Sequence, residues 1–390
     1  MNLLRGGRIV AQVNEQNDPN RTDVGDFLKV FACTAVMLQT VLGFALDVGP
    51  NTAQQSWIIG WYNAVKFTAP AFIFGILYTT VRTTSLRTLH GDYLPYLQKQ
   101  WTALFTPTIW WTLAYLVLMP GLQQREHFDG LVSFNWQFVN GNAAPHLWYN
   151  TMMLQFIILM PLFVGLTRWL TGHSGRGVAV SLITLVGYVW WVAIYDVEVF
   201  NGPRANDWYL LDRVFISFIL YAIAGILLWV FRDQLIPLLK RWWWVAAITL
   251  IWSWWRNNVE LKSFNGGLTF ANAPYLKPAG VVYALSAIAL IVTLALWLIK
   301  RQSQLLPTVH FLAVYAYRAF LGNVFWMNLL WQGERLFGWQ SNNALGVRVA
   351  VTYVLGWAIA FGFAIEGHRL ETWIKAGAER IYLKVEQSKA

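Results

Sequence analysis

The chain alternates along its whole length between long apolar runs and short polar stretches. The apolar runs reach about 20 residues, the length that an α-helix needs to cross a bilayer. Ten such runs are present, near residues 27–46, 58–78, 102–120, 147–167, 178–195, 211–231, 242–255, 279–299, 309–331 and 346–365, of which the seventh is the shortest. The pattern therefore predicts an all-α polytopic membrane protein with about ten transmembrane helices.

Polar segments at both termini flank one long apolar region, so the chain divides into three parts. Residues 1–24 mix acidic side chains with arginines and contain no short apolar segment followed by a small-residue cleavage site, so we expect an uncleaved N-terminal tail. Residues 25–366 form one transmembrane domain. Residues 367–390 place apolar side chains near one helical face and basic side chains elsewhere, which predicts an amphipathic tail at the membrane surface.

The charges support this topology and exclude a nucleic-acid-binding class. Charged residues make up only 12% of the chain, against about 25% in soluble domains. With the N-terminus inside, eighteen of the 29 Lys and Arg residues fall in inner segments and eight in outer ones. Because short-loop Lys and Arg concentrate on the cytoplasmic face, both termini are predicted to be cytoplasmic, in a multi-pass protein of the cell membrane.

The three remaining cations, Lys29, Lys66 and Arg318, fall within predicted spans. No Asp or Glu is expected at comparable depth, which argues against an ion-coupled pump. A buried cation without an acidic partner favours an anionic ligand, such as the phosphates of a nucleotide-like donor or of a lipid. Snorkelling of Lys29 to the interface and pairing of the two deeper cations with backbone carbonyls stay open as structural alternatives.

The sequence lacks the usual spacings of metal and hydrolase sites. It contains one cysteine, Cys33, and no HExxH, paired-His, GxxxxGK[ST] or GxSxG pattern, so no metal site is predicted. His146 stands where a long polar loop meets the fourth apolar run, a place suited to acid/base work. A merely interfacial or capping histidine is the alternative.

Five short segments follow one another along the apolar runs. They are Asp26-Phe-Leu-Lys29-Val-Phe-Ala32, Phe67-Thr-Ala-Pro70-Ala-Phe-Ile-Phe-Gly75, Lys99-Gln-Trp-Thr-Ala-Leu104-Phe-Thr-Pro107, His146-Leu-Trp-Tyr149 with the later Leu154-Gln-Phe156 and Pro161, and Ala316-Tyr317-Arg-Ala-Phe320-Leu321-Gly-Asn323. Together they resemble the acyltransferase-3 family of ten-span membrane proteins, including its polysaccharide and intercellular-adhesin branch. Their order and spacing along the chain carry the resemblance more than any one of them.

The resemblance implies an O-acyltransferase that moves an acyl group, commonly acetyl, from a cytoplasmic acyl-CoA to a hydroxyl of a surface polysaccharide or glycolipid. Lys29, Lys66 and Arg318 would then neutralise donor phosphates. Two departures stand out: Thr40 replaces the family's first-span histidine, eleven residues beyond Lys29, and Asn323 replaces the ninth-span histidine. Neither side chain shuttles a proton at neutral pH.

Two functions therefore stay open. In the first, an acyltransferase uses His146, or His127, as a substitute base, while Gln39, Thr40 and Asn323 hydrogen-bond the donor or the acceptor. In the second, the protein is a catalytically silent family member that exports or binds a glycan or lipid. A structural subunit of an envelope assembly is a third, simpler possibility. Membrane lipid and a surface glycan are the expected partners in the first two.

Overall fold

The computed structural model describes residues 22–83, 93–125, 127–200, 202–205, 208–263, 275–336 and 344–387. This part of the chain is helical and contains no β-strand. Most of the predicted N-terminal tail lies outside it. The elements, with π- and 3₁₀-helices written η, are α2 Val24–Asp47, α3 Thr52–Ala64, α4 Thr68–Thr83, α5 Tyr93–Gln100, η1 Trp101–Phe105, α6 Thr106–Leu118, η2 Pro120–Leu122, α7 Leu131–Asn140, α8 Trp148–Ile158, α9 Met160–Leu170, α10 Ser174–Ile194, η3 Tyr195–Phe200, η4 Tyr209–Arg213, η5 Phe215–Phe218, α11 Ile219–Val230, α12 Arg232–Lys262, α13 Pro278–Lys300, α14 Leu306–Leu336 and α15 Leu345–Gln387.

Each of the ten predicted apolar runs coincides with a helix or a pair of helices, but fewer elements qualify as complete spans. Within the described ranges, seven helices or continuous helical segments are long and apolar enough to cross a membrane. An eighth is possible if α8 and α9, which meet at a bend of 55°, form one broken span. The fold is thus a polytopic helical bundle, whereas ten spans stay a prediction.

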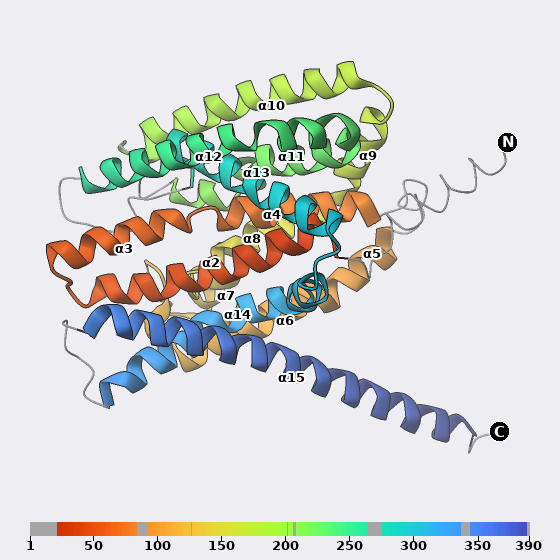
Figure 1. The fold of residues 1–390 in the computed structure, drawn as a ribbon. Helices are drawn as coiled ribbons and strands as arrows, with labels where there is room; N and C mark the ends of the chain where they lie inside the picture. Colours follow the sequence, from red (N-terminus) through yellow and green to blue (C-terminus); the bar gives the residue numbers. More distant parts are fainter. Residues whose placement is uncertain are drawn as a thin grey trace.

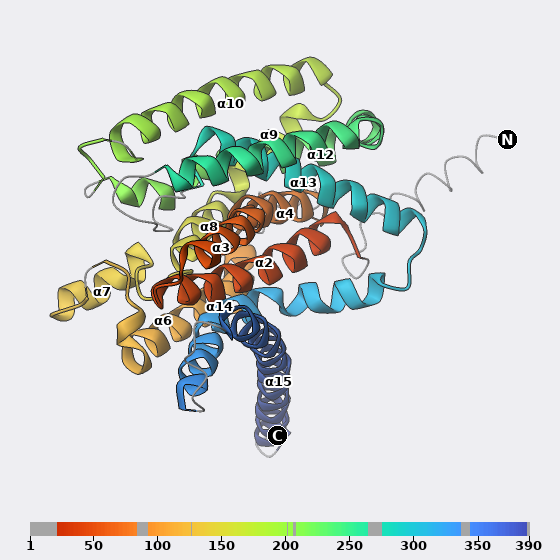
Figure 2. The same ribbon diagram turned by 60° about the vertical axis from the view of Figure 1, so that its left-hand side comes forward.

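The helices form three layers that Figures 1 and 2 show from two sides. One outer layer contains α10, α12 and α13, the middle contains α2, α3, α4 and α8, and the other outer layer contains α6, α14 and α15. The outward faces of α10 and α12 carry exposed apolar side chains, among them Ile183, Val186 and Ile251. Such faces fit a lipid environment.

The described chain begins and ends at the same end of the bundle (Figure 1). We call this the inner end, where α2 starts and α15 finishes. The arrangement agrees with termini on one side of the membrane, while their cytoplasmic placement stays a prediction. The helix α15 has 43 residues and no break at Gly367, so it extends ~64 Å, about twice the ~30 Å hydrocarbon core. The tail after Gly367 therefore continues the last span in place of forming a separate helix.

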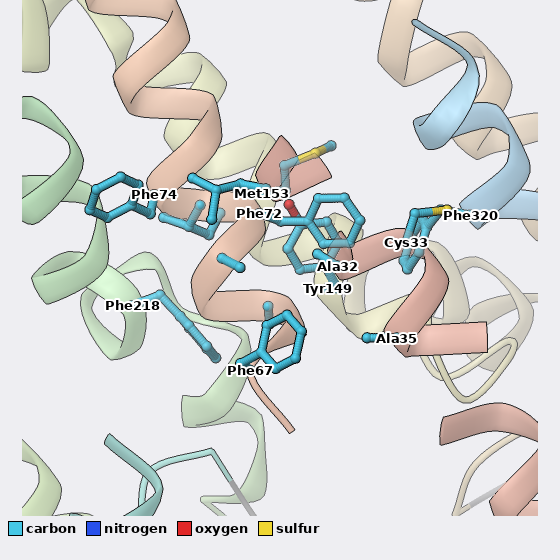
Figure 3. Packing of buried hydrophobic residues seen from close by; sticks show 14 of the residues in the cluster. Ala32, Cys33, Ala35, Phe67, Phe72, Phe74, Tyr149, Met153, Phe218 and Phe320 are labelled. Atoms are coloured by element: carbon cyan, nitrogen blue, oxygen red, sulfur yellow. The ribbon is translucent and has the colours of Figure 1, made fainter. Parts of the chain in front are cut away.

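Small residues let the central helices approach closely. A methyl group added at Gly225 of α11 would lie 2.5 Å from the backbone oxygen of Phe74 on α4. Such close approach of backbones replaces the hydrophobic driving force that helices lack in lipid. The aromatic residues around this contact, including Phe72, Phe74 and Phe218, fill the centre of the bundle (Figure 3).

We expect Gly225→Ala to destabilise the fold by about 1–3 kcal/mol, because backbone must move to admit the methyl group. Gly43→Ala on α2 is the matched control, since no atom lies within 4 Å of its added methyl. Thermal stability in detergent, followed by size-exclusion chromatography after heating, measures both. Equal melting temperatures for the two variants would contradict close α4–α11 packing.

Candidate functional site

The second predicted span is broken near its middle, between α3 and α4. The carbonyl oxygens exposed at the break are bound by side chains of other helices: Tyr283 Oη donates to Ala64 at 2.5 Å, and Gln39 Nε2 donates to Val65 at 2.6 Å. Non-helical backbone at membrane depth needs such partners, because lipid supplies none. The break places Lys66 inside the bundle.

Lys66 is held by aromatic groups. Its Nζ donates to Tyr62 Oη at 2.9 Å and lies 4.3 Å from the ring centroid of Tyr275. Among the residues that the structure describes, no carboxylate forms an ion pair with it. The ligand role of Lys66 stays a prediction.

Two sets of hydrogen-bonding side chains reach α2 at the neighbouring residues Gln39 and Thr40, one around Tyr275 and the other at Asn323 of α14. Tyr275 Oη lies 2.6 Å from Thr68 Oγ1 and 3.4 Å from Gln39 Oε1, and Thr40 Oγ1 lies 3.1 Å from Asn323 Oδ1. We call the two sets together the polar seam; its members are Gln39, Thr40, Lys66, Thr68, Tyr275 and Asn323. Of the predicted site residues, Gln39 and Lys66 both contact Tyr275, while Thr40 and Asn323 contact each other.

The amide of Asn323 is oriented by its own helix. Its Nδ2 donates to the carbonyl oxygen of Phe320, which leaves Oδ1 to face Thr40. The Thr40 hydroxyl also lies 3.1 Å from the Val36 oxygen and has one hydrogen to share between these acceptors. Thr40 and Asn323 thus form a hydrogen-bonded pair that orients groups without moving protons.

His146 lies beside the seam and is buried. Its Nε2 is 3.1 Å from the carbonyl oxygen of Leu321, two residues before Asn323, and its ring packs against Phe320 with centroids 5.1 Å apart. Since a carbonyl only accepts, Nε2 carries the hydrogen and Nδ1 carries a lone pair. Nδ1 has no hydrogen-bond partner in the described part of the chain. This lone pair is therefore open to a donor, while burial of the ring lowers the pKa of the imidazole.

Lys29 and Arg318 lie apart from the seam, near the inner end, and both are paired. Lys29 Nζ is 3.5 Å from Asp26 Oδ1, and Arg318 Nη2 is 2.7 Å from Glu371 Oε2 of α15. The expectation of unpaired cations is wrong for these two residues. For Arg318 it failed because α15 continues past the expected end of the last span and carries Glu371 alongside α14, whereas Lys29 pairs with Asp26, three residues earlier in α2.

A cavity of about 510 Å³ opens at this inner end beside the start of α14. One wall is His310, whose Nδ1 lies 2.8 Å from Asp26 Oδ2. Most of the other lining residues are apolar, including Leu306 and Phe311. The size is in the range of small-molecule sites, and Lys29 lies nearby through its pairing with Asp26.

At the opposite, outer end, a second polar cluster joins the loops before α8 and α11. Arg213 donates to the Asn140 carbonyl and, at 2.6 Å, to Asn142 Oδ1. Burial raises the pKa of the neighbouring Asp212 carboxyl to about 6, although Arg213, Arg125 and Lys66 act to lower it. The cluster fixes the outer loops against the bundle next to Lys66.

Sequence reasoning missed several of these residues. Tyr275 was not predicted because it follows a polar loop and meets Lys66 only through the fold, and the Asp26–His310 pair joins residues 284 positions apart. A weak local signal existed for the residues next to His146, since Tyr149 and Asn150 follow at helical spacing. His127, the other candidate base, is exposed. No group of three or more potential metal ligands occurs in the described ranges.

Comparison with known proteins agrees with this architecture. The family model described as an acyltransferase domain matches residues 26–365, which is most of the chain and all of the helical bundle up to α15's extension. No curated protein and no solved structure matches the chain. The matched region contains the five segments singled out above, together with the polar seam and His146. The protein therefore belongs to the acyltransferase-3 family of membrane acyltransferases.

Proposed function

We propose that the protein is an O-acyltransferase that moves an acyl group, in the simplest case acetyl, from a cytoplasmic acyl-CoA to a hydroxyl of a cell-surface polysaccharide or glycolipid. One observation supports this most strongly. A buried imidazole with a free Nδ1 lies beside a polar seam in the core of an acyltransferase-3 bundle. Acyl transfer to a hydroxyl needs such a proton acceptor.

The proposed donor enters from the inner end. Part of the donor binds in the cavity beside His310. Lys29 leaves its ion pair with Asp26 and binds a phosphate of the donor instead. Lys29 and Thr40 lie about 16 Å apart along α2, so an extended donor would reach from the inner end to the seam. Arg318 is neutralised by Glu371, and the phosphate contacts at this end therefore rest on Lys29.

In the seam, His146 Nδ1 takes the proton of the acceptor hydroxyl as its oxygen attacks the acyl carbonyl carbon. The carbon–oxygen ester bond forms, the carbon–sulfur bond of the thioester breaks, and the leaving thiolate takes the proton from the imidazolium. Gln39, Thr40 and Asn323 orient donor and acceptor by hydrogen bonds, and Lys66 offsets negative charge.

The second candidate function is a silent family member that binds or exports a glycan or lipid. The pairing of Thr40 with Asn323 favours it, because two positions that carry imidazoles in the family here hold side chains that do not titrate. This function requires no affinity for coenzyme A and no change in ester content.

The test compares alkali-labile ester on purified envelope glycans from a deletion strain and from strains expressing wild type or Lys29→Ala at matched levels. We expect ester to be lost on deletion, restored by wild type and restored only in part by Lys29→Ala. A coenzyme A titration of the purified protein should show weaker binding for Lys29→Ala. Unchanged ester on deletion, together with no coenzyme A binding, would favour the export or binding function.

A further inference from the structure

Three neighbouring polar side chains at the start of α8 are buried without full hydrogen bonding. They are His146 at 4% exposure, Tyr149 at 4% and Asn150 at 1%. The atoms without a partner in the described part of the chain are His146 Nδ1, Tyr149 Oη and both Asn150 Nδ2 and Oδ1. Buried polar groups are nearly always paired, so a cluster of unpaired ones points to a ligand that completes it.

The three side chains share one face. Tyr149 and Asn150 lie in the first turn of α8 and His146 in the turn just before it, at positions i, i+3 and i+4, and Tyr149 N bonds back to His146 O. The rings of His146 and Tyr149 both pack on Phe320, with centroids 5.1 and 5.4 Å away. The unpaired groups therefore belong to one site.

This face adjoins the polar seam. Tyr149 packs 5.3 Å from Phe72, one helical turn after the seam residue Thr68, and Phe320 accepts the amide hydrogen of Asn323. Figure 3 shows Tyr149, Phe72 and Phe320 together in the centre of the bundle. The unpaired donors are thus connected to the polar seam through Phe72 and Phe320, which contact Tyr149 and neighbour the seam residues Thr68 and Asn323.

The chemistry of the unpaired atoms matches acyl transfer. The reaction needs an acceptor for the hydroxyl proton and donors for the negative charge that grows on the carbonyl oxygen. His146 Nδ1 is an acceptor, while Tyr149 Oη and Asn150 Nδ2 carry donor hydrogens. Donors fixed before reaction in a site without water stabilise that charge strongly.

We propose that Tyr149 and Asn150 are catalytic residues that donate hydrogen bonds to the oxyanion of the tetrahedral intermediate formed from the acyl thioester. The inference rests on the proposed acyltransferase function. When the acceptor oxygen bonds to the carbonyl carbon, the carbonyl electron pair moves onto oxygen and is held by Tyr149 and Asn150. Its return expels the thiolate, which takes the proton held by His146.

The test is Tyr149→Phe in the purified full-length protein, assayed with acetyl-CoA and envelope glycans from the deletion strain. We expect kcat to fall about 10²–10³-fold with little change in KM for acetyl-CoA, since the lost bond forms only in the transition state. Thermal stability should stay equal or rise, because the removed hydroxyl has no partner. Asn150→Ala should lower kcat in the same way.

The matched control is Tyr188→Phe, whose hydroxyl is also buried but donates to the Ser217 oxygen at 2.7 Å. It should lose stability and keep its kcat. Full kcat in Tyr149→Phe, with active wild type, would overturn this inference alone, as would a stability loss in that variant matching that of Tyr188→Phe. A wild type without acyl transfer would overturn the proposed function and this inference together.

Discussion

His146→Ala is expected to lower the rate of acyl transfer by about 10²–10⁴-fold, the usual contribution of a positioned general base. The ring is buried, its Nε2 is tied to the Leu321 carbonyl, and its Nδ1 is unpaired beside the polar seam. Donor binding at the inner end should be unchanged. Single-turnover rates of the purified protein, with a coenzyme A titration in parallel, measure the two effects separately.

Two histidines serve as comparisons. His173→Ala, in the exposed turn before α10, should leave the rate within twofold of wild type. His127 is exposed on an outer loop, and its alanine variant should behave in the same way. A large rate loss in His127→Ala, with a normal rate in His146→Ala, would identify His127 of the outer loop as the general base. That result would refute the proposed site in the bundle core.

Asp23→Ala is expected to destabilise the fold by about 3–5 kcal/mol, because it breaks the buried ion pair between Asp23 and the Arg82 guanidinium. Asp23 and Arg82 are each 7% exposed, and Arg82 Nε lies 2.8 Å from Asp23 Oδ2. The same carboxylate caps α2 by accepting from Asp26 N at 2.9 Å, which adds to the loss. Thermal stability in detergent measures the change.

The control is Arg369→Ala, which removes an ion pair between side chains that are both 68% exposed. Its effect should stay below about 1 kcal/mol, since water already screens the pair. If Asp23→Ala unfolds at the same temperature as Arg369→Ala, the Asp23–Arg82 pair does not stabilise α2 against α4.

The sequence by itself determined the helical membrane class. The ten apolar runs coincide with helices because a chain in lipid must bond its own backbone, and a helix does so within one segment. It also determined the family, since the five ordered segments lie in or beside these helices.

Four of the six residues of the polar seam were also visible in the sequence. Lys66 was predicted as a charge within an apolar run, which must face protein, and Gln39, Thr40 and Asn323 were predicted from the family resemblance. Tyr275 was not visible, since nothing in its own segment marks it. Its role comes from packing that brings its hydroxyl to Thr68 and its ring to Lys66.

Only the tertiary structure decided which charges are free. Arg318 and Glu371 are 53 residues apart, and Asp23 and Arg82 are 59 apart. Hydropathy is a sum over neighbours in the sequence. Ion pairing depends instead on which helices lie side by side and on the depth in the membrane at which the two charged side chains meet. For the same reason only the fold showed that His146, Tyr149 and Asn150 are buried with polar atoms that have no partner among the described residues, the feature on which the proposed chemistry rests.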